Sequence, residues 1–358
     1  MKEIILDEIE NQISKVYAGA KIEDVAVLLK EYTSIYILYD AEVSVHTKQI
    51  IAALEKECPD SYKSKFSILA KEENKNIATV TNICEWLLEG GADRNAILLV
   101  IGGGLTTDIG GFAASIYKRG IDFAYIPTTV LAQVDAAIGG KTGVNLDSYK
   151  NIIGTIIQPK FTFLCPQPLE TLPNEIFVDG LAEMFKTFII DDAEHQYEIA
   201  SDLFSTIDKS SLKMKEIFPL MIAAAKVKIG VVTRDEFEKG ERRNLNLGHT
   251  FAHAIEKLSK NTISHGSAVS IGMVMAAKLS EKLGKCESDL VEKITSVLEA
   301  VGLPVKAPYS VEEMVEIMKK DKKADGDKIY FILPTSIGEV IQYKMDIDEL
   351  LQHTKDRI

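Results

Sequence analysis

AILLVIGGGLTTDIGGFAASIYKRGIDFAYIPTT, residues 96–129, is the stretch that decides the fold. Residues 96–104 form an apolar run that ends in three glycines, which is typical of a buried parallel strand. Residues 107–120 have small side chains on one face and predict a helix, and residues 121–129 predict another strand that ends at a proline turn. Because strand, helix and strand alternate, we expect an α/β layer with a parallel sheet.

The same alternation continues on the amino-terminal side of this stretch. Residues 34–40 form a short run of β-forming side chains, and residues 79–92 have helical spacing and end on two glycines. After about residue 175 the spacing is helical almost throughout. Strand patterns nearly vanish there until residues 328–334.

This change of pattern and the chain length both predict two domains. The 358 residues exceed the usual size of a single hydrophobic core. Three prolines lie close together within residues 165–175, where the pattern changes. We therefore expect an N-terminal α/β domain over residues 1–172 and a mostly α-helical C-terminal domain over residues 173–358.

The composition is ordinary for a globular enzyme, with 46% hydrophobic and 26% charged residues. A net charge of −12 argues against a nucleic-acid partner, because phosphate backbones require basic surfaces. No stretch reaches the ~18 apolar residues of a membrane-spanning helix, and the acidic N-terminus lacks the apolar segment of a signal peptide. The four cysteines share no metal-binding or redox spacing, so we expect a cytoplasmic protein without membrane contacts.

The glycines at the end of the apolar run suggest a nucleotide site. Gly102 and Gly104 fit the first two glycines of a dinucleotide-binding turn, whose backbone N–H groups approach a pyrophosphate. Thr107 stands where the third glycine belongs, so a purely structural turn is the alternative. Residues 127–151, rich in Gly, Thr, Asn and Lys, predict a long functional loop. Lys141 within it is either a ligand contact or a solvated charge.

Three of the six histidines fall in one window and suggest a metal site. His249 and His253 stand four residues apart, so their rings share one helix face. A catalytic zinc site needs about three protein ligands and an open position, and His265 and Glu183 are candidates for the third ligand. The alternatives are a hydrogen-bonded core pair of histidines and an internal salt bridge between Glu183 and Lys186.

Basic residues gather just before these histidines. They are Lys226, Lys228, Arg242 and Arg243, and Asn246 follows them. Interleaved acids make a solvated surface one interpretation. The other is recognition of a carboxylate or phosphate, for which the planar guanidinium is well suited.

The chain resembles the 3-dehydroquinate synthase family of sugar-phosphate cyclases. The matching segments run in order from about residue 96 to about residue 325: GGGLTTDIGGFAASIYKRG, IPTTVLAQVDAAIGGKTGVNL, YKNIIG, TLPNEIFVDGLAEMFK, NLNLGHTFAHAIE, HGSAVSIGM and KKDKK. Each segment alone is weak, and together they are specific. The resemblance implies a Rossmann-like N-terminal domain and a helical C-terminal domain, in agreement with the division above. It also implies a homodimer, NAD as cofactor and a divalent metal ion, usually zinc, with cobalt as the other candidate.

The resemblance also assigns the site residues. It implies that Glu183, His249 and His265 bind the metal and that His253 faces the substrate. Substrate contacts are expected from Asp135, Lys141, Asn151, Lys186, Lys228, Arg242, Asn246 and either Lys322 or Lys323. Arg119 is expected to reach the phosphate site of the partner subunit. Cofactor contacts are expected from Glu73, Gly103, Gly104, Leu105, Thr106, Thr107, Asp108, Thr128, Thr129, Lys141, Lys150, Leu169 and Thr171.

Two departures from the family pattern affect the adenosine side of the cofactor. The family usually has an Asp–Gly–Glu segment with a lysine three places after the Glu. Glu73 fits that Glu, but Asn76 stands where the lysine should be and Lys75 is one place off. Near the first strand, Glu42 replaces an Asn that the family tends to have.

The implied substrate is an anionic sugar-acid phosphate, 3-deoxy-D-arabino-heptulosonate 7-phosphate. The implied shikimate-pathway reaction forms 3-dehydroquinate and phosphate by transient oxidation, phosphate elimination, re-reduction, ring opening and aldol closure. Rival functions are another sugar-phosphate cyclase, a metal-dependent polyol dehydrogenase and a non-catalytic NAD- or metal-binding regulator. The presence of Lys228, Arg242 and Asn246 favours a substrate that carries a carboxylate.

Overall fold

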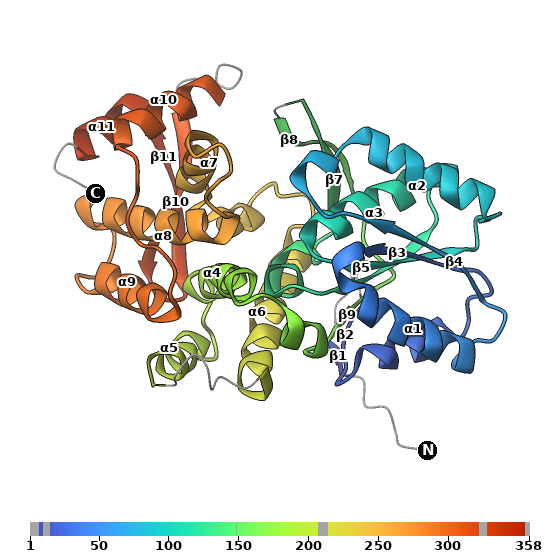
Figure 1. Ribbon diagram of the computed structural model, residues 1–358. Helices are drawn as coiled ribbons and strands as arrows, with labels where there is room; N and C mark the ends of the chain where they lie inside the picture. The colour runs from blue at the N-terminus through green and yellow to red at the C-terminus, as the bar shows by residue number, and fades with distance from the viewer. Residues whose placement is uncertain (1–6, 10–14, 148, 207–213, 322–327, 355–358) are drawn as a thin grey trace. The chain divides into compact units, whose positions relative to one another are not determined.

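The computed structural model describes residues 7–9, 15–147, 149–206, 214–321 and 328–354 (Figure 1). The chain divides into two compact units, one of residues 1–173 with 228–233 and one of residues 174–227 with 234–358. The division after Pro173 lies next to the boundary expected from the proline-rich segment. Nothing in the sequence pattern predicted that residues 228–233 would join the first unit.

The first unit is built on a seven-stranded sheet in the order β1-β2-β9-β6-β5-β3-β4. All neighbouring strands are parallel except β1 and β2, which pair antiparallel. The strands span Asp7–Ile9, Lys15–Ala18, Ile35–Asp40, Tyr62–Ile68, Ile97–Gly102, Asp122–Pro127 and Phe161–Leu164, which are β1 to β6 and β9. This parallel sheet confirms the α/β class expected for the N-terminal half.

The apolar run of residues 96–104 contains β5, in the middle of this sheet. Leu98 and Val100 face the core that the sheet forms with α2 (Ile77–Glu89) and α3 (Gly104–Ile116). Ile97, Leu99 and Ile101 face the opposite core, formed with α1 (Ser44–Glu57) and the short helix η1 (Ile22–Leu29). Because both faces are covered by helices, every position of the strand is apolar.

The prediction of a long loop over residues 127–151 is wrong in one respect, because most of this segment forms regular secondary structure. It contains one turn of π-helix, η5 (Ala132–Ala136), and a hairpin of β7 (Lys141–Leu146) and β8 (Tyr149–Ile156). Gly143 pairs with Gly154 across the hairpin, and a Cβ at Gly143 would lie 2.6 Å from the carbonyl oxygen of Ile153. The glycines that suggested a loop therefore permit close strand pairing.

The second unit is mostly helical, as expected. Its helices are α4 (Asn174–Ile190), α5 (Gln196–Thr206), α6 (Met214–Arg234, partly in the first unit), α7 (His249–Leu258), α8 (His265–Lys282), α9 (Leu290–Val301), α10 (Val311–Asp321) and α11 (Ile347–Thr354). A hairpin of β10 (Lys328–Ser336) and β11 (Glu339–Asp346) accompanies them, of which the sequence predicted only the first strand.

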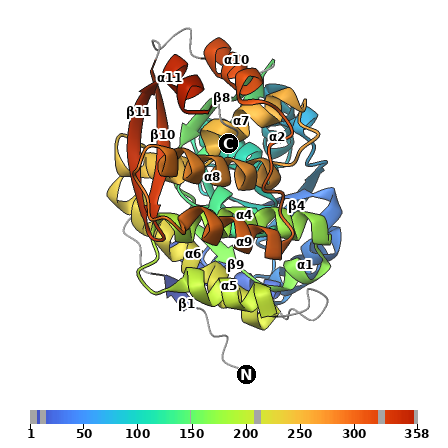
Figure 2. The same cartoon turned by 90° about the vertical axis from the view of Figure 1, so that its left-hand side faces the viewer.

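Helix α8 is the centre of the second unit. It packs against α4, α7, α9 and β10 (Figure 2). Most of its side chains are buried. A helix that is apolar on nearly every side must be covered on nearly every side. No helix among the described residues is long and apolar enough to cross a membrane.

Candidate functional site

Glu183, His249 and His265 converge in the second unit, although they lie on three different helices. His265 Nε2 lies 3.2 Å from Glu183 Oε1, and His249 Nε2 lies 3.7 Å from the same oxygen. One ligand atom from each residue lies within 4.8 Å of the other two. Two imidazole nitrogens and a carboxylate oxygen are the ligand types that zinc accepts, and a set of three leaves an open position for a substrate atom. The residues therefore fit a catalytic metal ion.

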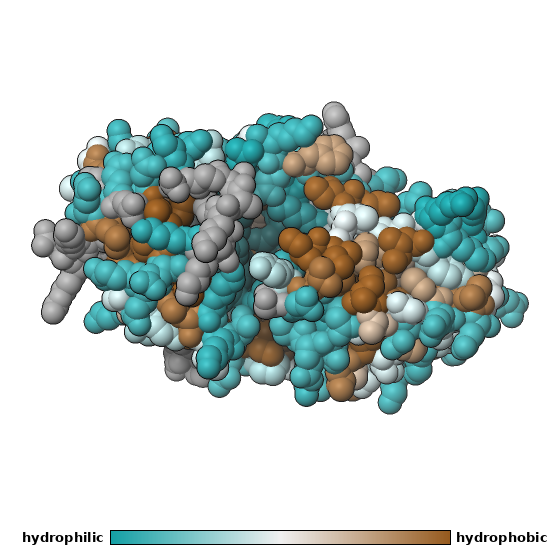
Figure 3. All heavy atoms as spheres, turned by 90° about the horizontal axis from the view of Figure 1, so that it is seen from above, coloured by the Kyte–Doolittle hydropathy of each residue, from teal (hydrophilic) through white to brown (hydrophobic). Residues whose placement is uncertain are grey.

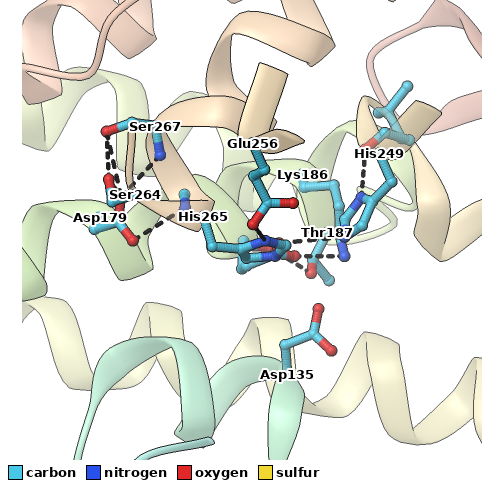
Figure 4. A network of polar contacts seen from close by, with 12 residues as sticks. Asp135, Asp179, Lys186, Thr187, His249, Glu256, Ser264, His265 and Ser267 are labelled. Carbon is cyan, nitrogen blue, oxygen red and sulfur yellow. Dashed lines mark hydrogen bonds and ion pairs between the residues drawn. The ribbon is translucent and has the colours of Figure 1, made fainter. Parts of the chain in front are cut away.

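The other ring nitrogen of each histidine is held by an oxygen. His249 Nδ1 lies 3.1 Å from the carbonyl oxygen of Leu247. His265 Nδ1 lies 3.4 Å from Glu256 Oε1, and Figure 4 shows Glu256 directly over that ring. Such outer contacts fix the tautomer of a metal-binding histidine. Both rings consequently present Nε2 to Glu183.

His253 lies beside this cluster without belonging to it. Its ring lies edge-on to the His249 ring with centroids 5.6 Å apart, nearly the same separation as the 5.4 Å between the His249 and His265 centroids. His253 is exposed and is not part of the group that could hold a metal among the described residues. The spacing of His249 and His253 alone therefore does not identify the metal pair.

The position of Glu183 suits both of the roles that its sequence neighbours suggested, a metal ligand and a salt-bridge partner of Lys186. Its Oε2 lies 2.5 Å from Lys186 Nζ, and both side chains are 1% exposed. Burial opposes ionisation of the Glu183 carboxyl, but Lys186 and the two histidines hold its pKa well below the usual value. The salt bridge thus keeps the carboxyl ionised through one oxygen and leaves the other oxygen facing the histidines.

The two histidines differ in their protonation. Burial, with the nearby Lys186 cation, lowers the pKa of His249 to about 3, so its ring is neutral at physiological pH. Burial also opposes protonation of His265, yet contacts with Glu183 and Glu256 raise its pKa to about 10. A metal ion at this site must therefore displace the proton of His265.

Glycines allow the helices of the cluster to approach closely. Gly248 precedes α7 with a φ of 79°, and a Cβ there would lie 2.8 Å from the amide nitrogen of Met273 in α8. A Cβ on Gly272 of α8 would overlap the carbonyl oxygen of Gly248. The backbones of α7 and α8 therefore touch next to His249.

The basic residues that precede the histidines separate into buried and exposed ones. Lys228 and Arg242 are buried, whereas Lys226 is exposed. Lys228 Nζ pairs with the carboxylate of Asp135 and lies 2.6 Å from the carbonyl oxygen of that residue, in η5. The interpretation as a solvated surface is therefore wrong for Lys228 and Arg242.

The segment before α7 is ordered by its own acids. The Asp235 carboxylate accepts N–H bonds from Lys239, Gly240 and Arg242, at 2.7–3.0 Å. Asn246 Nδ2 donates to Glu238 Oε1 at 2.7 Å. The Arg242 guanidinium donates to the carbonyl oxygen of Glu236. These contacts give Arg242 and Asn246 defined positions.

The glycine turn of the first unit joins β5 to α3. Gly103 is the N-cap residue of α3 and has no side chain that could accept a hydrogen bond. The first backbone N–H groups of the helix therefore receive no hydrogen bond from an N-cap side chain. The Thr128 amide donates to the Gly102 carbonyl, and Thr129 Oγ1 accepts from the Ala132 amide. Thr106 and Thr107 are buried, as is Leu169.

Lys75 is a further candidate site residue, which the sequence pattern did not indicate. It is 5% exposed, and its Nζ lies 2.6 Å from Asp108 Oδ2 and 2.5 Å from Asn151 Oδ1. Asn76 instead caps α2 by accepting from the Thr79 amide. Glu72, three places before Lys75, accepts from Asn145 Nδ2 at 2.7 Å. Glu72 and Lys75 therefore have the family spacing, a lysine three places after a glutamate. Glu73 and Asn76 do not, because residue 76 is not a lysine.

The remaining expected residues lie at the surface or outside the described part. Lys141 and Lys150 are exposed on the β7–β8 hairpin, and Thr171 Oγ1 lies 3.1 Å from His46 Nε2. Arg119 is exposed and has a left-handed φ of 69°. Asn151, at φ 55°, is also left-handed. Lys322 and Lys323 lie outside the described residues.

Comparison with known proteins gives matches over most of the chain. Family models described as 3-dehydroquinate synthase N-terminal and C-terminal match residues 65–179 and 180–324. A 3-dehydroquinate synthase of Pyrococcus abyssi is 43% identical over 281 residues, which cover 78% of this chain and 81% of that protein. Another from Campylobacter concisus is 40% identical over 328 residues, 89% of this chain and 91% of that protein.

Solved structures are also similar over nearly the whole chain. The 2-epi-5-epi-valiolone synthase of Streptomyces hygroscopicus, with NAD+ and Zn2+ bound, has a TM-score of 0.85 and is 25% identical, covering 99% of both chains. The similarity therefore covers both units of this chain. The similar protein contains the cofactor and the metal that the sequence led us to expect.

Proposed function

Because the chain belongs to the 3-dehydroquinate synthase family, we propose that it converts 3-deoxy-D-arabino-heptulosonate 7-phosphate to 3-dehydroquinate and phosphate, with NAD and a divalent metal ion. The observation that carries the proposal is the convergence of Glu183, His249 and His265. These residues would hold zinc, with cobalt as the alternative. When bound, NAD would accept and return a hydride and the metal would polarise oxygen atoms of the substrate.

The buried cations neutralise the substrate. Its carboxylate and phosphate are both anionic, and Lys228 and Arg242 are cations held in fixed positions by neighbouring oxygens. Lys186 and Lys141 are further cations of the proposed site. Asn246 and His253 orient hydroxyl groups or relay a proton, and Asp135 and Asn151 complete the polar contacts.

The cofactor is assigned to the first unit. Gly103 to Asp108 provide the glycine turn and the open amides of α3, which suit a pyrophosphate. Thr128, Thr129, Lys150, Leu169 and Thr171 are the other proposed contacts. On the adenosine side, we expect cofactor contacts from Glu72 and Lys75 instead of Glu73. These two residues have the family spacing, and hydrogen bonds hold Lys75 to Asp108 and Glu72 to Asn145.

The protein is proposed to act as a homodimer through an exposed apolar face of the first unit. Leu146, Tyr149, Ile152 and Ile156 on the β7–β8 hairpin are 39–63% exposed, and Figure 3 shows apolar side chains gathered on this side of the molecule. Thr155 Oγ1 donates to Ser115 Oγ at 3.0 Å, which joins the hairpin to the end of α3 near Arg119. Apolar patches of this kind mark protein interfaces.

The dimer proposal is tested by Ile152→Lys, which places a charge in the proposed interface. Sedimentation velocity should show a dimer for the wild type and a monomer for the variant. The variant should also bind substrate less tightly, because Arg119 would no longer reach the phosphate site of a partner subunit. A wild-type monomer would contradict the proposal.

A cytoplasmic location is part of the proposal. All four cysteines are unpaired thiols, as expected in a reducing compartment. The net charge of −12 supports a small-molecule substrate over a nucleic acid.

The activity is tested with purified protein, NAD, zinc and the heptulosonate phosphate. Phosphate should be released and 3-dehydroquinate should form in equal amounts, without net accumulation of NADH. Phosphate release only from glucose 6-phosphate or sedoheptulose 7-phosphate would identify a different cyclase. Net NADH would indicate a polyol dehydrogenase, and no turnover on any of them would favour a non-catalytic protein.

A further inference from the structure

Helix α8, which begins at the metal ligand His265, is capped by a side chain from another helix. Asp179 of α4 accepts N–H bonds from Gly266 at 3.0 Å and Ser267 at 2.8 Å. Ser264, the N-cap residue of α8, makes no side-chain cap to its own helix, and its hydroxyl donates to Asp179 instead. A carboxylate at a helix N-terminus satisfies open amides and interacts favourably with the helix dipole.

A second observation shows that this contact is close and specific. A Cβ on Gly266 would overlap the carbonyl oxygen of Asp179 and lie 2.7 Å from its carbonyl carbon. Glycine is therefore required for the first turn of α8 to reach the backbone of α4. Figure 4 shows the Asp179 carboxylate facing Ser264 and Ser267.

The same helix carries the other metal ligand. Asp179 and Glu183 are four residues apart on α4, so they lie on one face, one turn from each other. The Asp179 cap fixes the start of α8, where His265 is located, relative to the turn of α4 that carries Glu183. Metal–ligand distances tolerate only about 0.2 Å, so the contact between these two turns controls the fit of both ligands.

We propose that Asp179 is a positioning residue of the metal site, which sets the separation of His265 and Glu183 and thereby the metal affinity. The inference rests on the proposed function, since it assumes a metal ion at this cluster. Asp179 touches neither ring nor carboxylate of the ligands in the contacts above, so its effect passes through the backbone of α8.

The test compares zinc affinity in Asp179→Ala and Asp179→Asn with the wild type, by competition with a chelating dye. Asp179→Ala removes every acceptor and should weaken zinc binding about tenfold or more, within the range for outer-shell partners. Asp179→Asn keeps one oxygen acceptor and should recover most of the affinity, leaving a loss of about threefold. Cobalt-loaded Asp179→Ala should also have an altered visible absorption spectrum, which reports ligand geometry.

Asp192→Ala is the matched control. Asp192 is also half-buried, and its Oδ1 accepts the Tyr197 amide at 2.9 Å at the start of α5. This variant should lose thermal stability in the same way as a lost helix cap while keeping wild-type zinc affinity and cobalt spectrum.

The outcomes are decisive in each case. Wild-type zinc affinity in Asp179→Ala, or an equal loss of affinity in Asp192→Ala, would overturn the proposal. If Asp179→Ala does not fold, Asp179→Asn decides, and wild-type affinity in that variant would overturn it. A wild type that binds zinc but releases no phosphate would contradict the proposed function alone, because the zinc comparison does not depend on turnover.

Discussion

The candidate metal-binding cluster of Glu183, His249 and His265 uses side chains from three helices, α4, α7 and α8, whereas the turn between β5 and α3 offers mainly backbone groups. Residues 183 and 265 of the cluster are 82 positions apart and meet only when the unit folds. The turn is formed by consecutive residues. A site built from side chains should therefore be sensitive to single substitutions, whereas a site built from backbone groups should tolerate them.

The largest effect on zinc affinity is expected from Glu183→Gln, in the candidate metal-binding cluster. The variant should bind zinc more than about 100-fold more weakly than the wild type, beyond the effect of an outer-shell change. It should also lower the free energy of unfolding of the metal-free protein by about 3 kcal/mol, because the buried Lys186 loses its anion. Zinc competition and urea denaturation measure the two effects.

A double variant separates these effects. Glu183→Gln with Lys186→Met removes the unpaired charge, so it should regain most of the lost stability but none of the zinc affinity. Equal zinc binding in the single variant and the wild type would show that Glu183 is only a structural partner of Lys186.

A smaller loss of zinc affinity is expected from Glu256→Ala. This residue contacts His265 Nδ1 without being a ligand, and loss of such a partner weakens metal binding about 10–100-fold. Glu256→Gln can still accept from the ring and should lose less. If both variants bind zinc as the wild type does, Glu256 does not orient the ring.

The pKa of His265 predicts how zinc loading depends on pH. That pKa is about 10 in the metal-free fold, compared with the ordinary value of 6.5. The charged ring therefore stabilises the metal-free fold fully below pH 6.5, and this stabilisation is lost as the pH rises toward 10. Zinc must displace the proton, so the zinc affinity should rise about tenfold per pH unit between pH 7 and 9. Calorimetry in two buffers of different ionisation enthalpy should find about one proton released per zinc. No released proton at pH 7 would contradict the assignment.

The smallest effect is expected on the cofactor side, from Lys75→Met. Lys75 contacts Asp108 through a charged hydrogen bond, and its loss should raise the KM for NAD about tenfold. Zinc affinity should not change. Lys71→Met, in the same segment at an exposed position, is the control and should leave both quantities unchanged. A loss of zinc in Lys75→Met would show that the two regions are not independent.

The two regions also differ in how far the sequence predicted them. The strand β5, the glycine turn and α3 were predicted because their pattern is local and periodic. Family resemblance was needed to select His265 over His253, because helical spacing places His249 and His253 on one face and says nothing of a later helix. Asp179 and Lys75 were missed because their partners, Gly266 and Asp108, are distant in sequence. A signal for Lys75 existed in its spacing from Glu72.

The most direct test of the central claim compares zinc content and turnover in His265→Ala and His253→Ala. If Glu183, His249 and His265 hold the metal, His265→Ala contains no stoichiometric zinc and is inactive. His253→Ala then keeps about one zinc per chain while its turnover falls about 10²–10⁴-fold, as expected for a lost proton-transfer group. Full zinc in His265→Ala together with loss of zinc in His253→Ala would contradict the account.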